Sequence, residues 1–165
     1  GMQSTGVLAN AKHFPGHGDT DKDSHKTLPT INFDKKRIDE VELFPYNELI
    51  ANGLSSVMVA HLNVPSLESR TNYPSSLSKP IITDLLKSKL NFQGLIFTDA
   101  LDMKGVSNFS VPGEIDLQAF MAGNDVLLMS ENVEIGMEKI MLSYYSGHIS
   151  EDRLAHSVKK ILMAK

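Results

Sequence analysis

The 165-residue sequence contains no cysteine. The chain therefore has no disulfide, no thiolate nucleophile and no cysteine-bound zinc, and its redox compartment stays undetermined. No apolar run approaches the roughly 18 residues that a membrane-spanning helix needs, so we expect no membrane association. The net charge of −4 comes without any basic stripe, which argues against nucleic acid as a partner.

The composition is that of an ordinary globular domain. Hydrophobic residues make up 41% of the chain and charged residues 22%, both close to the averages for globular proteins. The length suits one domain and is short for two. No long linker, repeat or low-complexity tract divides the sequence, so we expect a single domain over residues 1–165.

Two kinds of apolar segment alternate along the chain. Short apolar runs typical of buried strands occupy residues 7–13, 55–62, 94–99 and 125–129. Segments with apolar residues at helical spacing occupy residues 35–52, 78–90, 114–122, 133–145 and 151–164. Pro45 is expected to interrupt the first helix or to open its second half, Gly123 to end the third, and Ser150 to cap the last.

Alternation of apolar strands with helices predicts a parallel sheet with helices outside it. A doubly wound open sheet and a (β/α)8 TIM barrel both fit this order. A complete barrel takes about 250 residues, whereas this chain has 165 residues and four expected strands. The fold class is therefore α/β, and the barrel interpretation is a partial (β/α)8 barrel, or half barrel, of about four strands.

Polar residues stand where three of the expected strands end. They are Lys12 and His13 after the first, His61 after the second and Asp99 after the third. The carboxyl ends of parallel strands form the active-site face of such folds, so these side chains are expected to share a cleft. From its position alone, Asp99 also fits a helix N-cap or a hydrogen-bonded turn.

A stretch rich in glycine, aspartate and histidine follows the first strand, and its composition allows only a loop. It reads KHFPGHGDTDKDSH from Lys12 to His25. Asp23 and His25 stand two residues apart, which on an extended loop places both side chains on one side. There the carboxylate can accept the imidazole N–H and raise the pKa of the histidine, so that the ring can act as an acid near neutral pH.

The histidines of this loop also raise the question of a metal. His13, His17 and His25 are separated by three and seven residues, spacings that match no usual zinc loop. We expect no metal and no other cofactor. His17 stands between two glycines and is expected to structure the loop.

The loop and the third strand together resemble a known family. Residues 11–25 read AKHFPGHGDTDKDSH, and residues 94–103 read GLIFTDALDM. Both runs closely resemble glycoside hydrolase family 3, in its β-N-acetylglucosaminidase (β-N-acetylhexosaminidase) branch. The resemblance runs through the whole chain and covers the C-terminal part of the family's catalytic barrel domain. It implies an enzyme that acts on carbohydrates.

The resemblance implies three catalytic residues. Asp99 matches the nucleophile, which forms a covalent glycosyl-enzyme ester. His25 matches the acid/base, and Asp23 matches its dyad partner. The implied reaction is retaining hydrolysis in two displacements, in which the histidine first protonates the leaving oxygen and then deprotonates water.

Four further residues match positions that bind the sugar or are expected to line its cleft: Lys12, His13, His61 and Met103. The implied substrate is a glycoside with terminal β-linked N-acetylglucosamine, such as a peptidoglycan or chitin fragment. In the family an upstream half supplies an acidic residue and an arginine that hold the sugar, and the sequence has no counterpart of that half. The chain alone is therefore expected to be weakly active or inactive.

A half barrel exposes strand edges and an apolar interior, so the chain is expected to self-associate or to adopt an open, altered sheet. Three functional alternatives stay open. They are a phosphorylase in which phosphate replaces water, a non-catalytic carbohydrate-binding remnant and a metal-dependent hydrolase. Neither the natural polymer nor the compartment follows from the sequence.

Overall fold

The computed structural model describes residues 1–18, 20 and 27–165. Its strands are β1 (Asn10–Phe14), β2 (Ser56–Val59), β3 (Leu95–Ala100) and β4 (Val126–Leu128). The longer helices are α2 (Phe44–Ala51), η4 (Pro80–Lys89), α4 (Glu114–Ala122), α5 (Val133–Tyr145) and α6 (Glu151–Ala164). The shorter helical segments are η1 (Met2–Thr5), α1 (Lys35–Arg37), η2 (Ile38–Glu42), η3 (Ser75–Leu77) and α3 (Lys104–Ser107).

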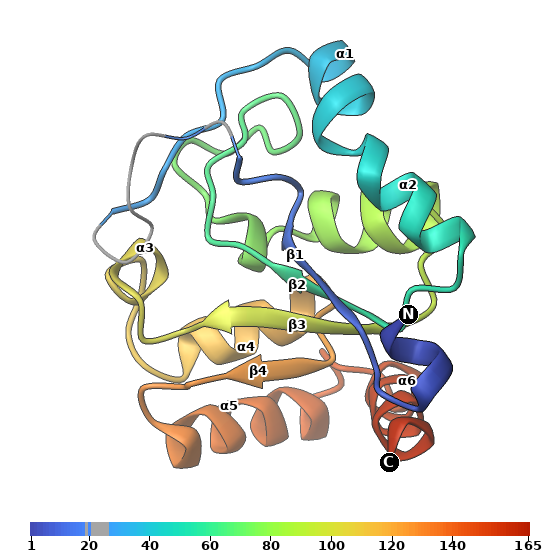
Figure 1. Ribbon diagram of the computed structural model, residues 1–165. Coiled ribbons are helices and arrows are strands. Elements are labelled where there is room, and N and C mark those ends of the chain that lie inside the picture. The colour runs from blue at the N-terminus through green and yellow to red at the C-terminus, as the bar shows by residue number, and fades with distance from the viewer. Residues whose placement is uncertain (19, 21–26) are drawn as a thin grey trace.

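The four strands form one sheet in the order β1-β2-β3-β4, and each neighbouring pair is parallel. Helices lie outside the sheet, with α2 toward its β1 side and α5 toward its β4 side (Figure 1). Within the described part of the chain β1 and β4 do not pair with each other, so the sheet is open. The predicted half barrel of four parallel strands is confirmed.

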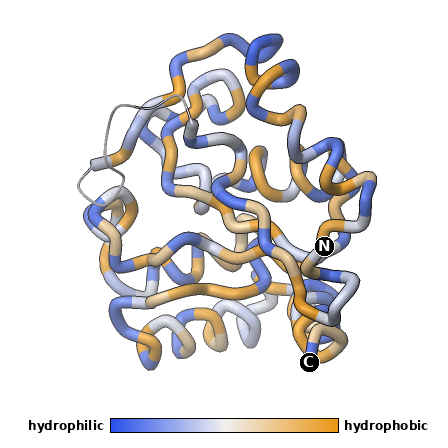
Figure 2. The backbone as a smooth tube through the Cα atoms, viewed as in Figure 1, coloured by the Kyte–Doolittle hydropathy of each residue, from blue (hydrophilic) through white to orange (hydrophobic). Residues whose placement is uncertain are grey.

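The central strands pack an apolar face into the core. Val57 and Val59, which lie on one face of β2, have no exposed surface, whereas Met58 on the other face is partly exposed. Helix η4 packs on the sheet through Ile81, Ile82 and Leu86, which belong to the same hydrophobic cluster. Figure 2 shows β4 and much of the central sheet in the hydrophobic colours.

The helix boundaries follow from the residues that cap them. Helices α4, α5 and α6 begin and end where the sequence predicts. The Ser150 Oγ atom accepts a hydrogen bond from the Arg153 N–H at 3.1 Å, and Pro45 stands in the first turn of α2, after α1 and η2. Segments η1, η3 and α3 were not predicted, since three or four residues are too few for a periodic pattern.

Helix α5 is apolar in sequence but largely exposed. Gly136 is its buried residue, whereas Val133, Met137, Leu142 and Tyr145 are each more than half exposed. Because α5 follows the edge strand β4, this side of the molecule presents an apolar surface. None of the helices within the described ranges is long and apolar enough to cross a membrane.

Candidate active site

The candidate site lies at the carboxyl ends of β1 and β3, on either side of β2. His13 belongs to β1 and Asp99 to β3. The His13 Nε2 and Asp99 Oδ2 atoms lie 3.6 Å apart, and the two side chains keep 28% and 17% of their surface exposed. An imidazole and a carboxylate therefore face each other where an external ligand can reach both.

Backbone contacts orient the Asp99 carboxylate. Its Oδ1 accepts a hydrogen bond from the Ala100 N–H at 2.9 Å, while Oδ2 is the oxygen nearer His13. The preceding residue, Thr98, is fully buried, and its Oγ1 accepts from the Leu128 N–H at 3.0 Å. Because side chains alternate along a strand, Thr98 anchors β3 to β4 and Asp99 points to the other face.

A pocket of about 260 Å³ lies beside His13. Its lining comes from β1, from the loop that follows and from the helical segments η2 and α2: Lys12, His13, Gly16, His17, Gly18, Val41, Glu42, Pro45 and Tyr46. Asp99 is not among these residues, so His13 borders the pocket on one side and the carboxylate on the other.

Glu42 is the buried acidic group of this pocket, and it was not among the predicted site residues. Its Oε1 accepts from the Arg37 Nη2 at 3.1 Å, whereas its buried Oε2 has no hydrogen-bond partner within the described part of the chain. Gly16 approaches it so closely that a Cβ at that position would lie 2.8 Å from the Glu42 Cβ. The sequence signal that could have identified Glu42 is its position: it is an acidic residue four positions after Ile38, on the apolar side of a helix.

The structure describes only some of the other residues in the loop that follows β1. His17 Nδ1 lies 2.7 Å from Thr20 Oγ1, a contact that fits its expected loop-structuring role. Asp23 and His25 lie outside the described residues, so their acid/base assignment stays a prediction. Across residues 1–18, 20 and 27–165, no group of three or more His, Asp or Glu side chains is arranged to hold a metal ion.

His61 and Met103 lie close to the strand ends but bury their side chains, unlike the exposed lining expected from the sequence. His61 is completely buried, with Nδ1 2.7 Å from Ser76 Oγ and Nε2 2.9 Å from the Ala100 carbonyl. Burial lowers the pKa of His61 and outweighs the opposing effects of that carbonyl and of the Asp99 charge. Met103 is 7% exposed and precedes α3 as its N-cap.

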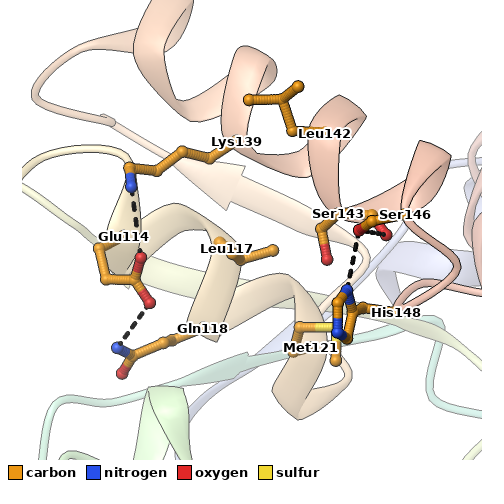
Figure 3. A pocket seen from close by; sticks show the side chains of 9 residues that line it. All are labelled: Glu114, Leu117, Gln118, Met121, Lys139, Leu142, Ser143, Ser146 and His148. Atoms are coloured by element: carbon orange, nitrogen blue, oxygen red, sulfur yellow. Dashed lines mark hydrogen bonds and ion pairs between the residues drawn. The ribbon is translucent and has the colours of Figure 1, made fainter.

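A second pocket, of about 650 Å³, lies between α4 and α5 (Figure 3). Its rim includes the Glu114–Lys139 ion pair, at 3.4 Å, and His148, whose Nδ1 lies 2.8 Å from Ser146 Oγ. None of the described residues predicted for catalysis or sugar binding lines it. The strand ends therefore remain the candidate active site.

The fold and the site together define an α/β protein that carries a carboxylate and an imidazole on the face where barrel enzymes place their chemistry. A family model described as "Glycosyl hydrolase family 3 N terminal domain" matches residues 1–164. The chain belongs to this family.

Individual relatives agree with the family match. The chain is 33% identical to a beta-hexosaminidase A from Pseudoalteromonas piscicida, covering 99% of this chain and 31% of the relative. A family 3 beta-N-acetylglucosaminidase from Paenibacillus sp. str. FPU-7 superposes with a TM-score of 0.94 at 41% identity, covering 99% and 31%. A beta-glucoside phosphorylase superposes with a TM-score of 0.91 at 27% identity, with the same coverage. The chain thus spans about a third of the length of these relatives.

Proposed function

We propose that this chain carries catalytic residues of a glycoside hydrolase that releases terminal β-linked N-acetylhexosamine. The observation that carries the proposal is the Asp99 carboxylate facing the His13 ring at the strand ends, with both side chains partly exposed. Family membership supports glycoside hydrolysis, and the names beta-hexosaminidase and beta-N-acetylglucosaminidase of two relatives support the sugar. Because the chain spans about a third of those relatives, we expect weak or no turnover from the 165 residues alone.

In the proposed mechanism Asp99 Oδ2 attacks the anomeric carbon and forms a covalent ester while the glycosidic bond breaks. The Ala100 N–H holds the other carboxylate oxygen, which fixes the direction of attack. His25, paired with Asp23, gives its proton to the leaving oxygen. It then takes a proton from the water that cleaves the ester, so the configuration at the anomeric carbon is retained.

Sugar binding is proposed for two residues of β1 that lie near Asp99. Lys12 and His13 donate hydrogen bonds to hydroxyl groups of the sugar. Polar donors at the edge of a pocket suit a polyhydroxylated ligand. Met103 lies three residues beyond Ala100, and its N–H donates to the Ala100 carbonyl at 3.1 Å; its buried side chain is proposed to support the cleft without contacting the sugar.

Covalent trapping tests the proposal even where turnover is slow. The chain is incubated with a slow fluoro-sugar derivative of N-acetylglucosamine, and the modified peptide is identified by mass spectrometry. We expect the label on Asp99 in the wild type and no label in Asp99→Asn. Asp84→Asn, the same change on an exposed position of η4, serves as the matched control. An ester that still forms in Asp99→Asn would exclude Asp99 as the nucleophile.

A phosphorylase is the second candidate, because a beta-glucoside phosphorylase is among the structural neighbours. In that reaction phosphate takes the place of water in the second displacement. Adding inorganic phosphate to a reaction with a nitrophenyl N-acetylglucosaminide separates the two functions. Sugar 1-phosphate as the main product would favour the phosphorylase, and free sugar as the main product favours the hydrolase.

A further inference from the structure

His61 joins the ends of two strands through its two ring nitrogens. The ring has no exposed surface, and it follows β2 while its Nε2 contacts the Ala100 carbonyl at the end of β3. Its Nδ1 contacts the hydroxyl of Ser76 in η3. The Ser76 carbonyl in turn accepts from Asn124 Nδ2 at 2.8 Å, just before β4. His61 thus links the end of β2 to the end of β3 directly, and Ser76 extends the network to Asn124, before β4.

The chemistry of the partners fixes the tautomer of His61. A carbonyl oxygen can only accept a hydrogen bond, so Nε2 must carry the proton and donate to Ala100. Nδ1 then has a lone pair and accepts from the Ser76 O–H. The neutral ring satisfies both contacts, in agreement with the direction in which burial moves its pKa.

The carbonyl that His61 contacts belongs to Ala100, and the N–H of the same residue holds the Asp99 carboxylate. Ala100 donates its N–H to Asp99 Oδ1, and its carbonyl accepts both from His61 Nε2 and from the Met103 N–H at 3.1 Å. The N–H and the carbonyl flank the same Cα, so a displacement of Ala100 that broke its carbonyl contacts would also move the N–H that orients Oδ1. The position of the Asp99 carboxylate is therefore mechanically tied to the His61 ring.

We propose that His61 is a positioning residue for Asp99, in place of the sugar contact that the sequence suggested. Its Nε2–H fixes the Ala100 turn, and that turn holds the carboxylate with Oδ2 free for the substrate. The inference rests on the proposed role of Asp99 as nucleophile. Misplacing a reacting group by about 1 Å can cost about 10²-fold in rate. The hydrogen bond from His61 Nε2 to the Ala100 carbonyl, here called the clamp, is therefore expected to act on kcat and to leave KM nearly unchanged.

Two amide substitutions test the clamp as a matched pair. In His61→Gln the side-chain amide nitrogen reaches the position of Nε2 and can donate to Ala100. In His61→Asn the shorter side chain reaches only the position of Nδ1. Both variants lose the same ring, so a merely structural histidine predicts equal effects for both. We expect His61→Gln to keep kcat near that of wild type and His61→Asn to lose about 10²-fold in kcat on a nitrophenyl N-acetylglucosaminide.

Nuclear magnetic resonance tests the clamp without turnover. The Ala100 amide proton, which donates to Asp99 Oδ1, is expected to move upfield in His61→Asn and to stay in place in His61→Gln. The wild-type ring should show the proton on Nε2. Equal shifts in both variants, equal losses of kcat, or a proton on Nδ1 would overturn the inference. A wild type that the fluoro-sugar does not label on Asp99 would count against the proposed function, while the amide shift would still decide on the clamp.

Discussion

Asp125 offers the strongest stability prediction, because its buried carboxylate joins three elements at the amino end of the sheet. The side chain has no exposed surface. Its Oδ2 accepts from the Ile96 N–H of β3 at 3.0 Å and from Lys160 of α6, and its Oδ1 accepts from the Ser157 hydroxyl of α6. Since Asp125 itself precedes β4, the carboxylate fastens the last helix to two strands.

The substitution Asp125→Asn removes the charge at nearly constant volume. One amide oxygen can still accept a hydrogen bond, but the amide nitrogen cannot accept from Ile96 or Lys160. Breaking a buried ion pair by removing one partner costs about 3–5 kcal/mol. We expect the lower end, about 3 kcal/mol, because one acceptor remains. For a chain of this length the thermal midpoint should then fall by about 6–12 °C.

Thermal and urea unfolding followed by circular dichroism at pH 7 measures this loss. Asp84→Asn makes the same chemical change at an exposed position and should stay within about 0.5 kcal/mol of wild type. A loss in Asp125→Asn no larger than in the control would refute the argument. It would mean that the carboxylate contributes no net stability in its buried site.

The pH dependence gives a second readout of the same group. Burial opposes ionisation of Asp125, but the hydrogen bonds from Lys160 and Ser157 and the nearby positive charges outweigh it and lower the pKa of Asp125. A carboxyl with a lowered folded pKa stabilises the fold above its unfolded pKa of about 3.9. That stabilisation is lost as the pH falls through the pKa of Asp125 in the folded state. The difference in thermal midpoint between the wild type and Asp125→Asn should therefore be largest at pH 5–7 and should decrease below about pH 4.

Three further predictions concern the acid/base, the packing and the assembly. His25→Ala should lose about 10²–10⁴ in rate on a poor leaving group and much less on an activated aryl glycoside; equal losses on both would remove His25 from the acid role. Gly94→Ala should destabilise the fold by about 1–3 kcal/mol in urea unfolding, because its Cβ would lie 2.3 Å from the Ser55 carbonyl oxygen. Gly18→Ala, whose Cβ would meet no atom of the described residues within 4 Å, is the control, and similar losses in both would contradict the steric argument. The open edges of β1 and β4 and the exposed apolar face of α5 should produce concentration-dependent association in sedimentation; a monomer at every concentration would argue against it.

The order of elements was predictable because each boundary carries a local signal. In the sequence Ser150 marks the start of one helix and Gly123 the end of another, and in the structure α6 begins after Ser150 and α4 ends before Gly123. The strands are apolar runs, so their existence was clear, although β1, β2 and β4 are shorter than predicted. Asp125 and Met129 flank β4 and belong to the turns on either side.

The direction of individual side chains could not be predicted in the same way. His61 follows a strand, but its partners are 15 and 39 residues away in the sequence, and only the fold brings them together. Asp99 illustrates a similar ambiguity. One of its oxygens makes the local backbone contact of a turn aspartate, the other faces His13, and Met103 rather than Asp99 caps α3.

Stability and the proposed chemistry occupy opposite ends of the sheet. At the amino end the Asp125 carboxylate is buried and saturated with donors, whereas at the carboxyl end Asp99 and His13 are partly exposed and 3.6 Å apart. Barrel folds commonly divide the two roles in this manner. Asp125→Asn should therefore lower the unfolding free energy and leave covalent trapping on Asp99 intact. Asp99→Asn should abolish trapping and leave the thermal midpoint near that of wild type, since the carboxylate is partly exposed and faces His13 and not a buried lysine or arginine.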